Sequence, residues 1–187
     1  FESTIPQGYG AGSSGALSAA AFGTFYSKIP HDTASVHRIL SETESFFHGK
    51  SSGLDPLTSY YDQAVLKHND SIELLRDFKL PSGFYLYDSL QTRNTKALVN
   101  VFINKKAHDT AFNQMLSVLD ALNQKIINCL IAGEAGFEKI FNEISVLQFN
   151  HFSMMIPDSV KTVWEAGLTS GAYDMKLSGA GGGGYFL

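Results

Sequence analysis

The segment from Glu44 to Asp55 contains two acidic residues eleven positions apart, separated by a loop of small residues. Two such carboxylates can divide the work of a phosphoryl transfer to an alcohol. One holds Mg²⁺ on the phosphates, and the other accepts or orients the hydroxyl proton. The turn at residues 51–53 would let Asp55 approach a substrate closely. Taken singly, Glu44 is also explained as a solvated helix residue, and Asp55 as the cap of a turn before Pro56.

The 17 glycines are concentrated in two loops, with four between Gly8 and Gly15 and five between Gly179 and Gly184. Dense glycine loses much backbone entropy on folding, so it indicates positive φ angles or a close approach of the backbone to a ligand. One loop lies near each end of the chain. We expect the two loops to converge on one ligand.

The first loop places Gly8, Gly10 and Gly12 at alternate positions directly before a predicted helix. The unpaired N–H groups and the dipole of a helix N-terminus favour an anion such as phosphate. Ser13 and Ser14 add hydroxyl groups, one of which can ligate Mg²⁺. A plain glycine turn with a serine cap is the structural alternative.

Two other nucleotide motifs fit less well. Residues 10–15 match the dinucleotide pattern Gly-x-Gly-x-x-Gly, but no Val/Ile-rich strand ending in an acidic residue follows about twenty positions later. Residues 49–51 match the end of a Walker motif, but its first glycine position holds Glu44 in a predicted helix. A dinucleotide-dependent oxidoreductase stays an alternative, which an NAD(H) titration tests.

The elements that must position these residues follow from periodicity and capping. The first loop is predicted to lie between a short strand and a helix, and the closing loop between two strands. The clearest amphipathic helix has apolar residues at three- and four-residue intervals from Phe112 to Cys129. The predicted strands are 1–5, 59–67, 72–78, 84–87, 173–177 and 185–187, and the predicted helices are 13–22, 33–48 (capped by Thr33), the region from 95, 137–147 and 158–166.

Residues 6–16 resemble the second signature of the GHMP kinases, Pro-x-Gly-x-Gly-Leu-Gly-Ser-Ser-Ala-Ala, and depart from it at Ala11 and Gly15. Residues 176–184 resemble the third signature, Lys-Leu-Thr-Gly-Ala-Gly-Gly-Gly-Gly, with Ser178 in place of threonine. The closing loop is the most specific of these matches.

Residues 44–55 are similar to the pattern of the mevalonate-kinase branch, Glu-x-x-x-His-Gly-x-Pro-Ser-Gly-Val/Ile-Asp, except that Ser51 replaces proline. Residues 88–99 resemble a further segment of the family, Arg-Ser-Thr-Lys-x-Leu-Val. The family's lysine-bearing first signature has no counterpart here, so we expect a fragment of a longer protein or a chain that a partner segment completes.

The resemblance implies an α+β GHMP kinase fold. Residues 1–80 would be the remainder of an N-terminal, ribosomal-S5-like α/β domain, which is incomplete here. Residues 81–187 would be a C-terminal, ferredoxin-like α/β domain, truncated at its end.

The resemblance also implies roles for individual residues. Asp55 would be the catalytic base, and Ser14 and Glu44 would bind Mg²⁺. His48 would pack or orient its loop, with a second base as the alternative. The ATP phosphates would contact Gly8, Gly10, Gly12, Ser13, Ser14, Gly179, Ala180, Gly181 and Gly182, and contacts to substrate or phosphate are expected at His48, Ser52, Arg93 and Thr95.

The implied activity is phosphorylation of a hydroxyl of mevalonate or a similar small acid, with ATP and Mg²⁺. Phosphomevalonate kinase, the related diphosphate decarboxylase and other GHMP members are alternatives on the same fold. A non-enzymatic nucleotide-binding protein on this fold is a further alternative, because the lysine signature is missing.

Composition sets the remaining limits. The chain has 187 residues, of which 44% are hydrophobic, and a net charge of −4, which predicts a globular protein. Lys and Arg are scattered, so we expect no nucleic-acid partner. Cys129 is the single cysteine and no run of 18 apolar residues occurs, which predicts a cytoplasmic protein without a membrane span. The sequence also allows a homodimer.

Overall fold

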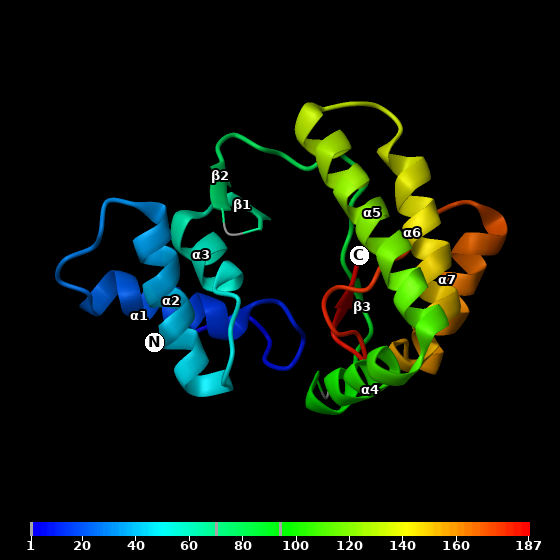
Figure 1. The fold of residues 1–187 in the computed structure, drawn as a ribbon, viewed down its shortest axis with the longest axis horizontal. Helices are drawn as coiled ribbons and strands as arrows, with labels where there is room; N and C mark the ends of the chain where they lie inside the picture. The colour runs from blue at the N-terminus through cyan, green and yellow to red at the C-terminus, as the bar shows by residue number, and fades with distance from the viewer. Residues whose placement is uncertain (1, 70, 94) are drawn as a thin grey trace. The chain divides into compact units, whose positions relative to one another are not determined.

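The computed structural model describes residues 2–69, 71–93 and 95–187, apart from the side chains of Phe47, His48, Thr95 and Lys96. The chain divides into two compact units (Figure 1). Unit 1 contains the chain up to Gln7 together with Ala11–Lys79. Unit 2 contains Gly8–Gly10 and Leu80–Leu187, so the first glycine loop contributes residues to both units.

Unit 1 consists of three helices and one antiparallel hairpin. Its core is formed by Phe22, Val36, Leu40 and Leu57, of which the last three are fully buried. Burying a side chain of this size contributes about 1.5–3 kcal/mol, so these few residues account for much of the packing between the helices. The elements are α1 (Ser13–Phe25), α2 (Thr33–His48), α3 (Leu54–Tyr61), β1 (Ala64–His68) and β2 (Ser71–Leu75).

Helix α2 covers the range predicted from the sequence, but the residue that caps its N-terminus differs from the prediction. The N-cap is Asp32, whose carboxylate accepts a hydrogen bond of 2.7 Å from Ser35 N–H. This hydrogen bond lowers the pKa of Asp32, because it stabilises the charged carboxylate. Thr33 is the first residue inside the helix.

The strand predicted over residues 59–67 was wrong at residues 59–61, which belong to α3. Gly53 precedes this helix in the left-handed conformation, with φ 71°. Leu57 and Tyr60 then follow at helical spacing and pack in the core of unit 1. Burial of this face outweighs the strand preference of the two adjacent tyrosines. The strand begins only at Ala64, where it pairs with Leu75.

Unit 2 is dominated by helices. In Figure 1, α6 lies between α5 and α7, and both neighbours pack against it. Trp164 is fully buried in the core and donates a hydrogen bond of 2.8 Å from Nε1 to Ser145 Oγ. The elements are α4 (Thr95–His108), α5 (Thr110–Ala132), α6 (Phe137–His151), the 3₁₀ turn η1 (Ser153–Met155), α7 (Asp158–Ser170) and the strands β3 (Tyr87–Asp88) and β4 (Tyr185–Phe186).

The strands of unit 2 are shorter than predicted. The strand expected over 84–87 is reduced to β3, which pairs antiparallel with β4. The strand expected over 173–177 is reduced to a single bridge between Leu177 and Phe186. In unit 1, the described residues 2–5 of the first predicted strand have no strand structure. Short apolar runs show strand preference, but they need a hydrogen-bonded neighbour to form a ladder.

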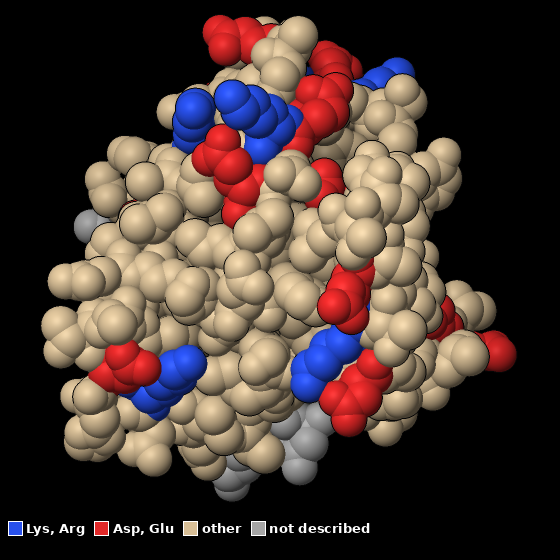
Figure 2. Space-filling view, turned by 90° about the vertical axis from the view of Figure 1, so that its right-hand side faces the viewer, with Lys and Arg blue, Asp and Glu red and all other residues tan. Residues whose placement is uncertain are grey.

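Helix α5 is long and apolar enough to span a membrane by length and composition alone. Its apolar residues Phe112, Met115, Ile126 and Cys129 are buried in the clusters that it forms with neighbouring elements of unit 2. A single helix of this length and composition is weak evidence for a membrane span. On the face drawn in Figure 2, acidic and basic side chains lie beside one another, and the described residues form no continuous surface of one sign.

The mixture of helices and small antiparallel sheets is compatible with the α+β class. The ribosomal-S5-like and ferredoxin-like arrangements of the two parts stay predictions.

Candidate functional site

Glu44 is the most informative residue of unit 1, because its carboxylate is buried with only 7% of the residue exposed. Ser14 Oγ–H donates to Glu44 Oε1 over 3.0 Å, and Ser51 Oγ–H donates to Glu44 Oε2. Among the described side chains, no Lys or Arg forms an ion pair with this carboxylate. A buried carboxylate without a cation is unfavourable. The oxygen ligands that Mg²⁺ prefers are present here, so Glu44 and Ser14 fit a metal of this kind.

The start of α1 provides the second part of the site. Gly12 is its N-cap in the left-handed conformation, and no side chain caps the helix. The serine cap that the sequence suggested is therefore absent, and Ser13 and Ser14 form the first helical residues. The first hydrogen bond of the helix runs from Ala16 N–H to Gly12 O. The amide groups before Ala16 have no partner within the helix, which suits an anion.

Asp55 lies in the first turn of α3, beside the start of α1, and its side chain is exposed. The two helix ends approach closely at Gly15. A Cβ on Gly15 would lie 2.8 Å from both Asp55 Cβ and Pro56 N, closer than real contacts allow. The absence of a side chain at Gly15 therefore lets Asp55 lie next to the helix end that carries Ser14.

The loop before α3 is held by α2. His37 Nε2 lies 2.7 Å from Ser52 O, and Ser41 Oγ–H donates to Ser51 O over 3.0 Å. Ser52 is exposed, as expected for a contact to substrate, although that role stays a prediction. The side chain of His48, another predicted contact, lies outside the described residues.

Arg93 is the centre of the predicted site residues in unit 2. Its Nη1 donates to Ser178 O over 3.3 Å, and its backbone N–H donates to Gly8 O over 3.1 Å. A Cβ on Gly10 would collide with the guanidinium, and one on Gly179 would lie 3.1 Å from Nη1. The guanidinium thus lies between residues of both glycine loops, where a phosphate-binding cation is expected.

The two glycine loops also contact each other directly within unit 2. Tyr185 N–H donates to Tyr9 O over 3.2 Å, and their rings lie 5.5 Å apart between centroids. Gly184 packs so closely on the Tyr9 backbone that any side chain there would clash. A common ligand for the two loops stays a prediction.

The closing loop divides into residues with different surroundings. Gly179 is exposed beside Arg93, and Ala180 is half-buried. Gly181 is buried against Met155, and Gly182 N–H donates to Met155 O over 2.6 Å. We therefore expect Gly179 and Ala180 to be the positions nearest a ligand, while Gly181 and Gly182 fix the loop to the core of unit 2. The side chain of Thr95, the last predicted contact, lies outside the described residues.

Several residues near these positions, Ser51 among them, were not assigned a site role from the sequence. Burial lowers the pKa of Lys176, whose Nζ donates to Leu177 O over 3.2 Å. Lys176 stood inside the third signature, but nothing in the pattern indicated burial. His37 and Ser41 were missed because their partners are backbone carbonyls, which carry no sequence signal.

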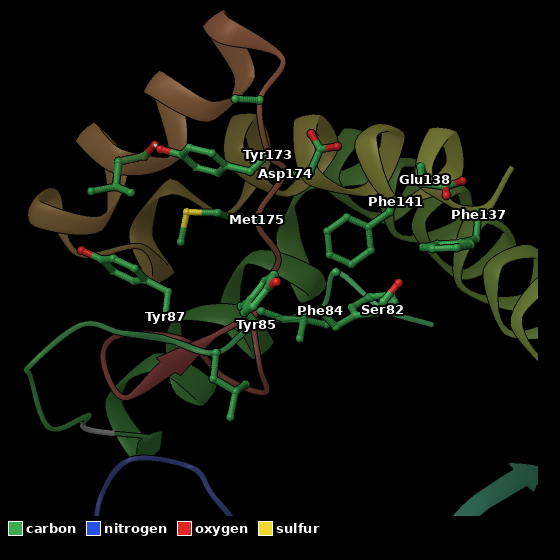
Figure 3. A pocket seen from close by; sticks show the side chains of 15 residues that line it. Ser82, Phe84, Tyr85, Tyr87, Phe137, Glu138, Phe141, Tyr173, Asp174 and Met175 are labelled. Carbon is green, nitrogen blue, oxygen red and sulfur yellow. Dashed lines mark hydrogen bonds between the residues drawn. The ribbon is translucent and has the colours of Figure 1, made fainter. Parts of the chain in front are cut away.

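Unit 2 also contains an apolar groove of about 670 Å³. Figure 3 shows Phe84, Tyr85, Phe141, Tyr173 and Met175 around it. None of the predicted site residues lines this groove.

Residues 1–63 match the family model of the GHMP kinases N terminal domain. This match contains Ser14, Glu44 and Asp55. The chain is also 27% identical over 192 residues to a mevalonate kinase from Pyrococcus furiosus, an alignment that covers 97% of this chain and 56% of that enzyme. The chain therefore spans about half the length of this relative. Together, the two comparisons support a GHMP, mevalonate-kinase-like protein.

Proposed function

We propose that this protein is an ATP- and Mg²⁺-dependent kinase that phosphorylates a hydroxyl of mevalonate or a similar small acid. The observation that carries the proposal is the buried carboxylate of Glu44, which accepts a hydrogen bond from Ser14 at the start of α1. The likeness to a mevalonate kinase supports this choice of acceptor. The proposal applies to the whole protein, of which this chain is at least a part.

In the proposed reaction, Asp55 accepts or orients the proton of the acceptor hydroxyl as the hydroxyl oxygen bonds to the γ-phosphorus. The bond between the γ-phosphorus and the bridging oxygen breaks, and ADP leaves. Its exposed position in the first turn of α3 leaves it accessible to an acceptor from solvent. A positioned general base of this kind contributes about 10²–10⁴-fold to the rate.

Glu44 and Ser14 would hold Mg²⁺, which when bound neutralises charge on the phosphates. The free amide groups at the start of α1 would bind phosphate oxygens. In unit 2, Arg93 and the backbone around Gly179 would bind phosphate oxygens as well. A cytoplasmic location is part of the proposal, because the single cysteine, Cys129, is buried and free.

The test is an ADP-release assay of the protein with mevalonate, phosphomevalonate and a set of sugars as acceptors. We expect release of ADP with mevalonate. Asp55→Asn should lower kcat by about 10²–10⁴-fold while nucleotide binding is retained. Glu44→Gln should abolish the Mg²⁺ dependence of nucleotide binding. Glu42→Gln, which neutralises an exposed carboxylate of the same helix that pairs with Arg38, should change neither property.

The other outcomes each identify an alternative. Turnover with phosphomevalonate instead of mevalonate would reassign the acceptor. Nucleotide binding without turnover on any acceptor would favour a non-enzymatic nucleotide-binding protein. Unchanged turnover by Asp55→Asn would exclude Asp55 as the base.

A further inference from the structure

Ser51 is the position at which the chain departs from the family pattern in the acidic segment, where it replaces proline. In the structure, its hydroxyl is part of the Glu44 site, since Ser51 Oγ–H donates to Glu44 Oε2. The other carboxylate oxygen, Oε1, accepts from Ser14 over 3.0 Å. The two oxygens of Glu44 therefore have different partners, one from the start of α1 and one from the loop before α3.

The same hydroxyl group also accepts a hydrogen bond. Gly53 N–H donates to Ser51 Oγ over 3.0 Å, which uses one acceptor lone pair of the hydroxyl while its proton is donated to Glu44. Gly53 is the N-cap of α3, and Asp55 lies in the first turn of that helix. One hydroxyl thus connects the carboxylate that would bind the metal with the helix start that carries the proposed base.

The backbone of Ser51 is fixed as firmly as its side chain. Its N–H donates to Ser45 Oγ over 2.9 Å, and its carbonyl oxygen accepts from Ser41 Oγ over 3.0 Å. His37 continues the series, with Nε2 2.7 Å from Ser52 O. His37, Ser41 and Ser45 are spaced four residues apart on α2, so they lie along one side of the helix and hold the loop at successive turns.

We infer that Ser51 is a positioning residue for the metal site. It fixes Glu44 through Oε2 and leaves Oε1, next to Ser14, to face the cation. Proline at this position lacks both the N–H and the hydroxyl group, so it can make neither hydrogen bond. This inference rests on the proposed role of Glu44 as a metal ligand.

The test measures Mn²⁺ binding to the protein in the presence of ADP by electron paramagnetic resonance, which does not depend on turnover. Ser51→Ala removes a hydrogen bond to a charged group, so Mn²⁺ binding should weaken about 10- to 100-fold. Ser51→Thr keeps the hydroxyl and should restore most of the affinity. Ser51→Pro, which introduces the family residue, should not restore it.

Thr43→Ala is the matched control. Thr43 precedes Glu44 on α2, but its hydroxyl donates to Ile39 O within the helix over 2.8 Å. We expect wild-type Mn²⁺ affinity for this variant. A urea unfolding curve for each variant separates loss of the site from loss of the fold.

The outcomes distinguish this inference from the proposed function. If Glu44→Gln leaves Mn²⁺ affinity unchanged, Glu44 is not a ligand and the metal role in the proposed function fails. If Glu44→Gln weakens binding but Ser51→Ala does not, only the role of Ser51 is overturned. Wild-type Mn²⁺ affinity in Ser51→Pro would also overturn the role of Ser51.

Discussion

Two glycines in helix α1 provide a sharp test of how its start packs. A Cβ on Gly15 would lie 2.8 Å from Asp55 Cβ and Pro56 N, so it would meet backbone that cannot rotate away. A Cβ on Gly23 would lie 3.6 Å from the Tyr60 ring, an ordinary van der Waals distance. Substitution by alanine should therefore have opposite effects at the two positions.

The magnitudes follow from two competing effects. Replacing glycine by alanine inside a helix stabilises it by about 1 kcal/mol. Gly23→Ala should show most of this gain. At Gly15 the same change adds overpacking, which costs about 1–3 kcal/mol, and a smaller helix gain applies in the first turn. We expect Gly15→Ala to be less stable than wild type, with about 2 kcal/mol between the two variants.

The assay is urea unfolding followed by far-UV circular dichroism, with native-state hydrogen exchange of the amides in α1 and α3 as the local readout. Fluorescence of the single tryptophan, Trp164, reports unit 2 and serves as the reference. If Gly15→Ala is as stable as Gly23→Ala, the close approach of Asp55 to α1 does not exist. We also expect Gly15→Ala to lower kcat, because it displaces Asp55.

Ser145→Ala should destabilise unit 2 by about 3 kcal/mol, because it leaves the buried N–H groups of Trp164 and Met175 without their acceptor. Urea unfolding checks this, with exposed Ser117→Ala on α5 as the control; equal stability of the two variants would contradict it. For Lys176, burial lowers the pKa, so the folded state disfavours the charged amine. The free energy of unfolding should therefore rise as pH rises through this lowered pKa, and stop rising above the ordinary value of 10.5. Lys176→Met should be more stable than wild type at neutral pH and lack this rise in thermal melts across pH; a parallel rise in the variant would exclude Lys176 as its source.

Local sequence determined much of the helical structure. The apolar spacing from Val36 to Phe47 predicted α2, and the spacing from Phe112 to Cys129 predicted the centre of α5. Helical periodicity is repeated over several turns, so it can be recognised without knowledge of the neighbours. The strands were less predictable, because a ladder needs a partner that local sequence does not name. For the same reason the strand prediction over 59–67 included the last three residues of α3, although Leu57 and Tyr60 pack as helical neighbours.

The acidic pair and the glycine loops were also found from the sequence, because spacing and residue type alone show which groups can bind metal and phosphate. Only the tertiary structure decided how they are used. It buried Glu44, placed Asp55 against Gly15, and gave Ser51 a hydrogen bond to a carboxylate seven residues away. Burial, close approach and hydrogen bonding depend on where separate helices come to lie. A sequence pattern specifies the chemical groups but not these distances.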